Sequence, residues 1–286
     1  MATTQISGAG GTTVSFSNTP QAQNDVFYFS EDSTGTLVLN VLSNDLGGAA
    51  KQLYSIDNAD SATTSTKTYA PADLLIRDTA YSTDAAVPVA TADTSYLGAR
   101  IWISTDGTIH YDKTSIDSKI QALGAGQVLI DKLTYAIQLG NGTLSWATAT
   151  IQFTGTNDAA VIGTPTVADV TEDTPNSAAV TLSATGTISI SDIDTGEAHF
   201  QTSVSGAAGN LGGLVLAADG SYTYSVANAA VQFLGAGATH VDTFTVTAAD
   251  GTTKDVSFTI HGTNDAAVIG TPTVADVTED TPNSAA

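Results

Sequence analysis

Acidic residues recur in this sequence in three patterns that could bind a cation. Asn-Asp pairs stand at 24–25, 157–158 and 264–265, Glu-Asp pairs at 31–32, 172–173 and 279–280, and an Asp-x-Asp at 192–194. Asp192 and Asp194 can face one ion, because alternate side chains of an extended segment point to the same side. Ca²⁺ takes about six to eight oxygen ligands, which a linker Asn-Asp, a first-strand glutamate and this Asp pair can supply together. The patterns therefore predict calcium binding.

A second interpretation is that these are ordinary turn residues, since Asn-Asp and Asp-Gly are common in turns. Two features favour calcium. The patterns return at matched offsets, and the chain carries 29 acidic and 8 basic residues, a formal net charge of −21. Such a charge opposes folding unless cations bind, and it repels nucleic acid and anionic membranes. We therefore expect no nucleic acid as a partner and no direct insertion into a membrane.

The segment GTNDAAVIGTPTVADVTEDTPNSAA occurs twice without a change, at 155–179 and at 262–286, so the copies start 107 residues apart (262 minus 155). This is the size of a small domain rather than of a solenoid repeat. The expected organisation is a flexible or strand-like N-terminal arm (1–23), an enlarged first domain (24–158), a complete repeat (159–265) and the start of the next repeat (266–286). We expect the chain to be part of a longer tandem array.

Short β-branched or aromatic runs separated by turn signals predict an all-β fold. NDVFYF, ARIWIS and SWATATIQFTG in the first domain are typical of strands, as are SYTYSV, DTFTVTA and KDVSFTIHG in the second. Five to seven such runs per domain indicate a β-sandwich. We therefore expect two tandem Ig-like or cadherin-like β-sandwich domains joined by a short linker. The best helical candidate, 115–126, is expected to form only one or two turns.

The first domain is longer than the second, and most of the surplus falls at residues 61–95. The simpler interpretation of this insertion is a packed surface loop. The alternative is that the enlarged first domain is a ligand-binding module, which grips a glycan, a peptide or a partner surface through the insertion. Trp102 and Trp146 lie in apolar strands of the same domain. Core packing is the simpler interpretation of both, and a sugar-stacking platform is the other.

Several functional classes lack their sequence signals. The chain has no cysteine, and its four histidines show neither metal-binding nor catalytic spacing. A nucleophile elbow, a His-Glu-x-x-His and a phosphate loop are all missing from the sequence, so we do not expect an enzyme. No apolar run reaches the roughly 18 residues of a membrane span, and no signal peptide is visible.

The stretch DGSYTYSVANAAVQFLGAGATHVDTFTVTAADGTTKDVSFTIHGTNDAAVI resembles the VCBS-type repeat of large bacterial RTX adhesins, and the likeness covers nearly all of 159–265. NDVFYFSEDSTGTLVLNVLSNDLGG in the first domain resembles a related cadherin-like repeat. The resemblance implies Ca²⁺-loaded immunoglobulin-like sandwiches in a stiff extracellular stalk, exported by type I secretion to the bacterial cell surface. It further implies a structural role in adhesion and biofilm formation. Neighbouring repeats would be the partners of a monomeric chain, with a host or abiotic surface or a glycan beyond them.

The layout is also similar to that of cadherins, whose calcium sites lie between successive domains. Carried over, this resemblance implies a junction site with the ligands Glu31, Asn157, Asp158, Asp192, Asp194 and Asp250. It implies that Glu172, Asn264 and Asp265 serve the following junction, which we expect to be incomplete here. The chain departs from the cadherin pattern in its linker, where Gly155 and Thr156 replace the leading acid. Asp131 and Asp242 are the candidates for the mid-domain acid.

Overall fold

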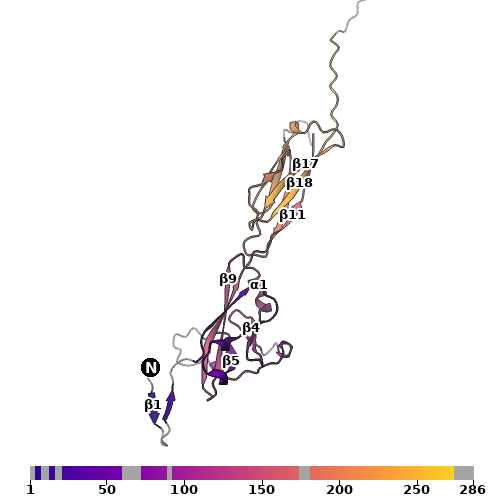
Figure 1. Ribbon diagram of the computed structural model, residues 1–286. Coiled ribbons are helices and arrows are strands. Elements are labelled where there is room, and N and C mark those ends of the chain that lie inside the picture. The colour runs from indigo at the N-terminus through magenta and orange to yellow at the C-terminus, as the bar shows by residue number, and fades with distance from the viewer. Residues whose placement is uncertain are drawn as a thin grey trace, which may run out of the picture. The chain divides into compact units, whose positions relative to one another are not determined.

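Figure 1 shows the computed structural model of the chain, which describes residues 4–7, 13–16, 21–59, 72–88, 92–173 and 181–273. The chain divides into two compact units. Unit 1 comprises Met1–Ala159 together with Asp192–Glu197, and unit 2 comprises Ala160–Ser191 and Ala198–Ala286. Both are built from β-strands. In the described part of the chain, no helix is long and apolar enough to cross a membrane.

Unit 1 contains a short antiparallel pair and two four-stranded sheets. The pair is β1 (Thr4–Ser7) with β2 (Thr13–Phe16). The first sheet has the order β3 (Asp25–Ser30), β10 (Leu144–Thr154), β9 (Val128–Gln138), β5 (Gln52–Asp57). The second has the order β4 (Leu37–Leu39), β8 (Ile109–Asp112), β7 (Arg100–Ile103), β6 (Asp93–Thr94). Strand β3 runs parallel to β10, and the other neighbours in these sheets are antiparallel.

The two sheets of unit 1 share one hydrophobic core. Along β10 every second residue is buried, namely Ala147, Ala149, Ile151 and Phe153, which is the alternation of a strand with one face in a core. The Phe153 ring lies 6.1 Å from that of Tyr111 on β8 of the other sheet. The side chains of both sheets belong to a single buried cluster. Unit 1 is therefore a β-sandwich, as the sequence predicts.

The helical content of unit 1 is small. A 3₁₀ turn, η6 (Lys113–Ile116), leads into the single-turn helix α1 (Asp117–Ile120). Ile116, Ile120 and Leu123 are buried together in the core, which confirms the prediction of one or two turns with a shared apolar face. The remaining 3₁₀ turns of the described residues are η1 (Val41–Ser43), η2 (Gly48–Ala50), η4 (Ala72–Leu75), η5 (Asp84–Ala86) and, in unit 2, η7 (Asn228–Ala230).

The insertion at 61–95 is described only in part, because residues 60–71 and 89–91 lie outside the described residues. The part that is described includes η4, η5 and β6. Leu74 and Val87 in it are buried, and the Arg77 guanidinium lies 5.8 Å above the Tyr54 ring of β5. This part packs against the sandwich as a surface loop does. Its role as a ligand-binding feature stays a prediction.

Unit 2 repeats the two-sheet design. One sheet has the order β11 (Val161–Pro165), β13 (Thr181–Ser191), β16 (Ser221–Ala227), β15 (Gly213–Leu216). The other has the order β12 (Asp169–Thr171), β18 (Thr253–His261), β17 (Thr239–Thr247), β14 (Ser205–Gly206). Tyr224 of β16 stacks on Phe258 of β18, with ring centroids 4.6 Å apart and planes 6° apart. Since these strands belong to different sheets, this stack lies in the core of a second β-sandwich.

Candidate functional site

Glu31 is the residue around which the predicted calcium site of unit 1 is built. It follows directly after β3, and its backbone N–H donates to the Thr154 carbonyl at the end of β10, 3.0 Å away. Glu31 is fully buried. The Thr156 backbone N–H and hydroxyl lie 2.5 and 2.6 Å from Glu31 Oε1. Its other oxygen, Oε2, is buried and has no hydrogen-bond partner among the described residues.

The segment 192–197 brings two further carboxylates into unit 1. The Thr195 N–H donates to the Ala122 carbonyl, 3.1 Å away. The Asp158 N–H donates to Asp194 Oδ2 (2.9 Å), and the Asp194 N–H donates to Asp192 Oδ1 (3.0 Å). The remaining oxygens, Asp192 Oδ2 and Asp194 Oδ1, are buried without a hydrogen-bond partner in the described part of the chain.

These carboxylates are close enough to influence one another. The pKa of Asp158 is raised, first by partial desolvation and then by the negative charges of Asp194, Glu31, Asp32 and Asp192. The structure thus brings together five of the predicted ligands in unit 1: Glu31, Asn157, Asp158, Asp192 and Asp194. The side-chain amide of Asn157 donates to the Asp158 carbonyl, 3.0 Å away.

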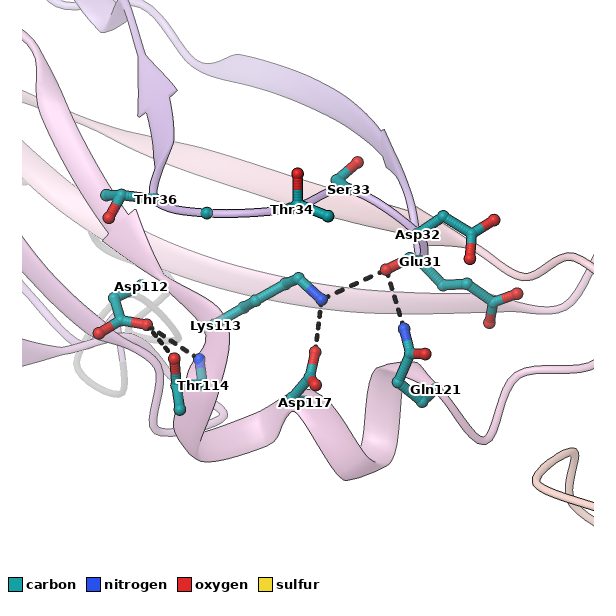
Figure 2. Close-up of a pocket in the computed structure, with 11 residues that line it drawn as sticks. Glu31, Asp32, Ser33, Thr34, Thr36, Asp112, Lys113, Thr114, Asp117 and Gln121 are labelled. Atoms are coloured by element: carbon teal, nitrogen blue, oxygen red, sulfur yellow. Dashed lines mark hydrogen bonds and ion pairs between the residues drawn. The ribbon is translucent and has the colours of Figure 1, made fainter.

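A polar pocket of about 630 Å³ lies beside Glu31 (Figure 2). It runs between the 31–36 segment and the turns of η6 and α1. Lys113 donates to both the Glu31 carbonyl (3.3 Å) and the Asp117 carboxylate, and the Gln121 amide donates to the same carbonyl (3.0 Å). Figure 2 shows the Glu31 and Asp32 carboxylates on the opposite side from Lys113. The lysine therefore fixes the Glu31 backbone without neutralising its carboxylate.

Whether this carboxylate cluster fits a cation depends on which of its oxygen atoms remain without a hydrogen bond. Among the described residues, no group of three or more His, Asp or Glu side chains converges closely enough to hold a metal ion as it stands. However, three carboxylates of one cluster each leave a buried oxygen without a hydrogen bond: Glu31, Asp192 and Asp194. A buried carboxylate oxygen without a partner is costly, and hard oxygen donors are what Ca²⁺ prefers. The donor set therefore fits calcium.

Unit 2 repeats the arrangement around Glu172. Its N–H donates to the His261 carbonyl at the end of β18 (3.0 Å), and its Oε1 accepts the Thr263 N–H (2.6 Å). The Asn264 amide donates to the Asp265 carbonyl, 3.2 Å away, as Asn157 does to Asp158. The three predicted ligands of the following junction thus lie at the same end of unit 2, where Glu172 is buried and both Asn264 and Asp265 are exposed.

The predicted ligand Asp250 belongs to unit 2. Its Oδ2 accepts the Ala160 N–H (3.1 Å), and its Oδ1 accepts the Thr252 N–H (2.9 Å). Asp250 thus closes the turn between β17 and β18 and holds the beginning of unit 2. This use of the Asp250 carboxylate agrees with the second interpretation of the sequence, in which the acidic residues are ordinary turn residues.

The two candidates for the mid-domain acid have internal roles. Asp131 is fully buried and accepts the Tyr111 hydroxyl (2.5 Å), the Leu97 N–H (2.8 Å) and the Ser95 hydroxyl. Asp242 occupies the matching place in unit 2. It accepts the Tyr224 hydroxyl (2.7 Å) and the N–H groups of Leu211 (2.9 Å) and Gly212 (2.7 Å). Because each carboxylate is used to hold a loop against the core, neither is a candidate metal ligand.

Sequence reasoning missed the role of Thr156. It noted the residue only as a departure from the cadherin linker, whereas the structure uses its N–H and hydroxyl to orient Glu31. The hydroxyl also lies 3.1 Å from Asp32 Oδ2. The signal was present in the sequence, since the Gly-Thr-Asn-Asp of 155–158 returns at 262–265. This recurrence does not by itself show that residue 156 orients residue 31, because only the fold places the two side by side.

One part of the chain matches a family model. Residues 157–262 match the family model described as bacterial cadherin-like domain. Among solved structures, the protocadherin gammaB7 EC3-6 cis-dimer is 12% identical with a TM-score of 0.41, and Drosophila N-cadherin EC1-4 is 10% identical with a TM-score of 0.33. Each alignment covers 84% of this chain, but only 46% and 49% of those chains, so this chain spans less than half of their length. No curated protein matches.

Proposed function

We propose that the two units are calcium-stabilised extender repeats of a bacterial cell-surface adhesin. The observation that carries the proposal is the carboxylate cluster of unit 1, in which Glu31, Asp192 and Asp194 each have a buried oxygen without a hydrogen bond in the described part of the chain. The match of residues 157–262 to a bacterial cadherin-like domain supports the same function, because such domains are often extracellular adhesion or extender repeats.

In this proposal Ca²⁺ is held by the carboxylates of Glu31, Asp158, Asp192 and Asp194, with Asp32 at the edge of the cluster. The ion supplies positive charge where five carboxylates repel one another. The segment 192–197 is part of unit 1, while the residues on both sides of it belong to unit 2. An ion that binds this segment to Glu31 would hold the segment within unit 1, and a row of such ions is what the proposal expects to stiffen an array of repeats.

The wider setting follows from this function. Extender repeats hold a terminal adhesive region away from the cell, so we place this chain outside the cell, at the bacterial surface. Export by a type I system and a part in biofilm formation belong to this proposal. The partners are neighbouring repeats of the same chain, and the chain itself is a monomer that performs no catalysis.

Calcium dependence of unfolding tests the proposal. We expect Ca²⁺ to raise the melting temperature in calorimetry relative to EDTA. A ligand of the folded state alone stabilises it by about 2.7 kcal/mol at one hundred times its dissociation constant. The double variant Asp192→Asn/Asp194→Asn should lose most of this shift. Its stability in EDTA should equal or exceed that of the wild type, because the substitution removes like-charge repulsion.

The matched control is Asp219→Asn. Asp219 lies in a turn of unit 2, where it accepts the Ser221 N–H (2.9 Å) and hydroxyl (2.6 Å), and an asparagine oxygen can accept both. This variant should respond to Ca²⁺ as the wild type does. Small-angle scattering with and without Ca²⁺ reports whether the tandem stiffens. An unchanged melting temperature in Ca²⁺, or an equal loss of the shift in both variants, would refute the proposal.

A further inference from the structure

The two tryptophans of unit 1 have different surroundings. Trp102 on β7 is only 3% exposed and packs against the ring of His110 and the guanidinium of Arg100. It alternates with the core residues Ile101 and Ile103 and is not part of the core cluster, so it is buried on the outer face of its sheet. Trp146 on β10 is half-buried instead. It lines a pocket of about 370 Å³, together with Asn24, Asp25, Val26, Lys132, Ala147, Thr148 and Thr150. Core packing is therefore the wrong description of Trp146.

The strand alternation places the pocket on the outer face of the sheet. Ala147 and Ala149 of β10 are buried in the core. Trp146, Thr148 and Thr150 alternate with them and so share the opposite face. The indole and two hydroxyls therefore follow one another along the strand on the side that meets solvent.

The strand register adds a cation to this row. Thr150 pairs with Lys132 on β9 and with Val26 on β3, so all three side chains stand on the outer face side by side. Lys132 is exposed. Within the described residues it takes part in no ion pair, so its ammonium group can donate hydrogen bonds to a ligand.

The end of the pocket beside Trp146 is closed by the segment that leads into β3. Asn24 Oδ1 accepts the Thr148 N–H, 3.1 Å away. Ser145 Oγ accepts the N–H groups of Gln21 (3.1 Å) and Ala22 (2.9 Å). These bonds fix the segment against β10, so the wall is formed before any ligand binds.

We infer that this pocket binds a neutral pyranose saccharide. The indole face suits the apolar C–H face of a sugar ring, while the hydroxyls of Thr148 and Thr150 and the Lys132 ammonium can bond to sugar hydroxyls. The volume is near the lower end of the usual range for ligand pockets, which matches a short saccharide. A net charge of −21 disfavours an anionic ligand. The pocket shares no residue with the calcium cluster, so this inference does not rest on the proposed function.

Fluorescence and calorimetric titrations test the inference. The probes are cellobiose, maltose, lactose and N,N′-diacetylchitobiose, added to the full chain in Ca²⁺. We expect at least one to bind in the millimolar range. Trp146→Ala should weaken that binding about tenfold or more, because it removes the aromatic face. Trp146→Phe should retain most of the calorimetric binding and lose the fluorescence response. Lys132→Gln, which changes an exposed side chain, should weaken binding several-fold.

Tyr28→Ala is the matched control. Tyr28 lies on β3, on the same outer face, and is 70% exposed, but it does not line the pocket. Its removal should leave the saccharide affinity unchanged, and the melting temperature of each variant verifies its fold. The inference is overturned if none of the four saccharides binds the wild type. It is equally overturned if Trp146→Ala and Lys132→Gln both bind like the wild type, or if Tyr28→Ala weakens binding as much as Trp146→Ala.

Discussion

The Tyr135 hydroxyl has one proton to donate, but several acceptor oxygens lie within hydrogen-bond distance of it. It is 2.6 Å from the Gln23 carbonyl, 2.7 Å from Asp25 Oδ2 and 3.2 Å from Asp45 Oδ1. A tyrosine hydroxyl donates one hydrogen bond. Asp25 and Asp45 are both buried, and Asp45 Oδ2 has no hydrogen-bond partner among the described residues. Burial, opposed by the Tyr135 hydrogen bond and reinforced by the Asp45 charge, raises the pKa of Asp25 to about 6.

This raised pKa predicts a pH dependence of stability. The folded state binds the Asp25 proton more tightly than the unfolded state, whose pKa is near 3.8. The stabilisation by this proton is therefore complete below about pH 4 and is lost as the pH rises through about 6. As the pH rises from about 4 to about 6, the unfolding free energy of the wild type should fall by up to about 2 kcal/mol more than that of Asp25→Asn, since one pKa unit corresponds to about 1.4 kcal/mol. Urea unfolding at several pH values, in EDTA, measures it.

Asp106→Asn is the control for this prediction. The pKa of Asp106 is lowered, chiefly by the hydrogen bond from the Thr108 hydroxyl. Its contribution to stability therefore has the opposite sign and is lost as the pH falls. A wild-type slope that persists unchanged in Asp25→Asn would show that the Asp25 proton does not stabilise the fold.

At the scale of the elements, two Asp-Gly turns of unit 2 differ in the space beside glycine. Gly220 has φ +83° and Gly251 has φ +92°, a region that residues with a Cβ avoid. A Cβ on Gly220 would lie 2.1 Å from the Ile188 carbonyl oxygen, whereas a Cβ on Gly251 would meet nothing within 4 Å. The first turn is packed against a neighbouring strand, and the second is open.

This difference predicts unequal costs for the same substitution. Gly251→Ala should cost about 1–2 kcal/mol, which is the strain of the left-handed conformation. Gly220→Ala should cost clearly more, because the backbone of β13 must also move. Chemical denaturation of both variants in EDTA compares the two costs. Equal losses of stability would contradict the close approach of Gly220 to Ile188.

At the scale of the whole molecule, charge is distributed unequally along the chain. Seven of the eight basic residues precede residue 133, and Lys254 is the only one between 159 and 265, where eleven carboxylates stand. Counted by unit, unit 1 has 18 acids and 7 bases in 165 residues, and unit 2 has 11 acids and 1 base in 121 residues. The net negative charge per residue, and with it the self-repulsion, is therefore greater in unit 2. Added salt screens such repulsion, with a Debye length of about 10 Å at 0.1 M.

We therefore expect NaCl, in EDTA, to raise the melting temperature of unit 2 more than that of unit 1. Calorimetry of the full chain at low and moderate salt measures both transitions. The transition that Gly220→Ala lowers is assigned to unit 2. If salt raises the two transitions equally, the charge difference between the units does not limit their stability.

The sequence by itself determined the class of fold and the strands and turns beside which the acidic residues stand. Alternating apolar residues and Asp-Gly turns require strands with one buried face, and these signals depend only on neighbours along the chain. They predicted the sandwiches and the short helical turn near Ile116 and Ile120. The resemblance to cadherins, rather than the recurring patterns, implied that residues 31 and 157–158 belong to one site.

The tertiary structure alone decided what each polar side chain does. Asp131 and Asp194 are both aspartates that follow or lie within strand-like sequence, yet one holds a loop inside the core and the other leaves a buried oxygen without a hydrogen bond. Trp102 and Trp146 likewise both alternate with core residues, and they differ in how far other side chains cover them. These outcomes depend on contacts between residues far apart in the chain, such as Thr156 with Glu31, and such contacts arise only when the sheets pack.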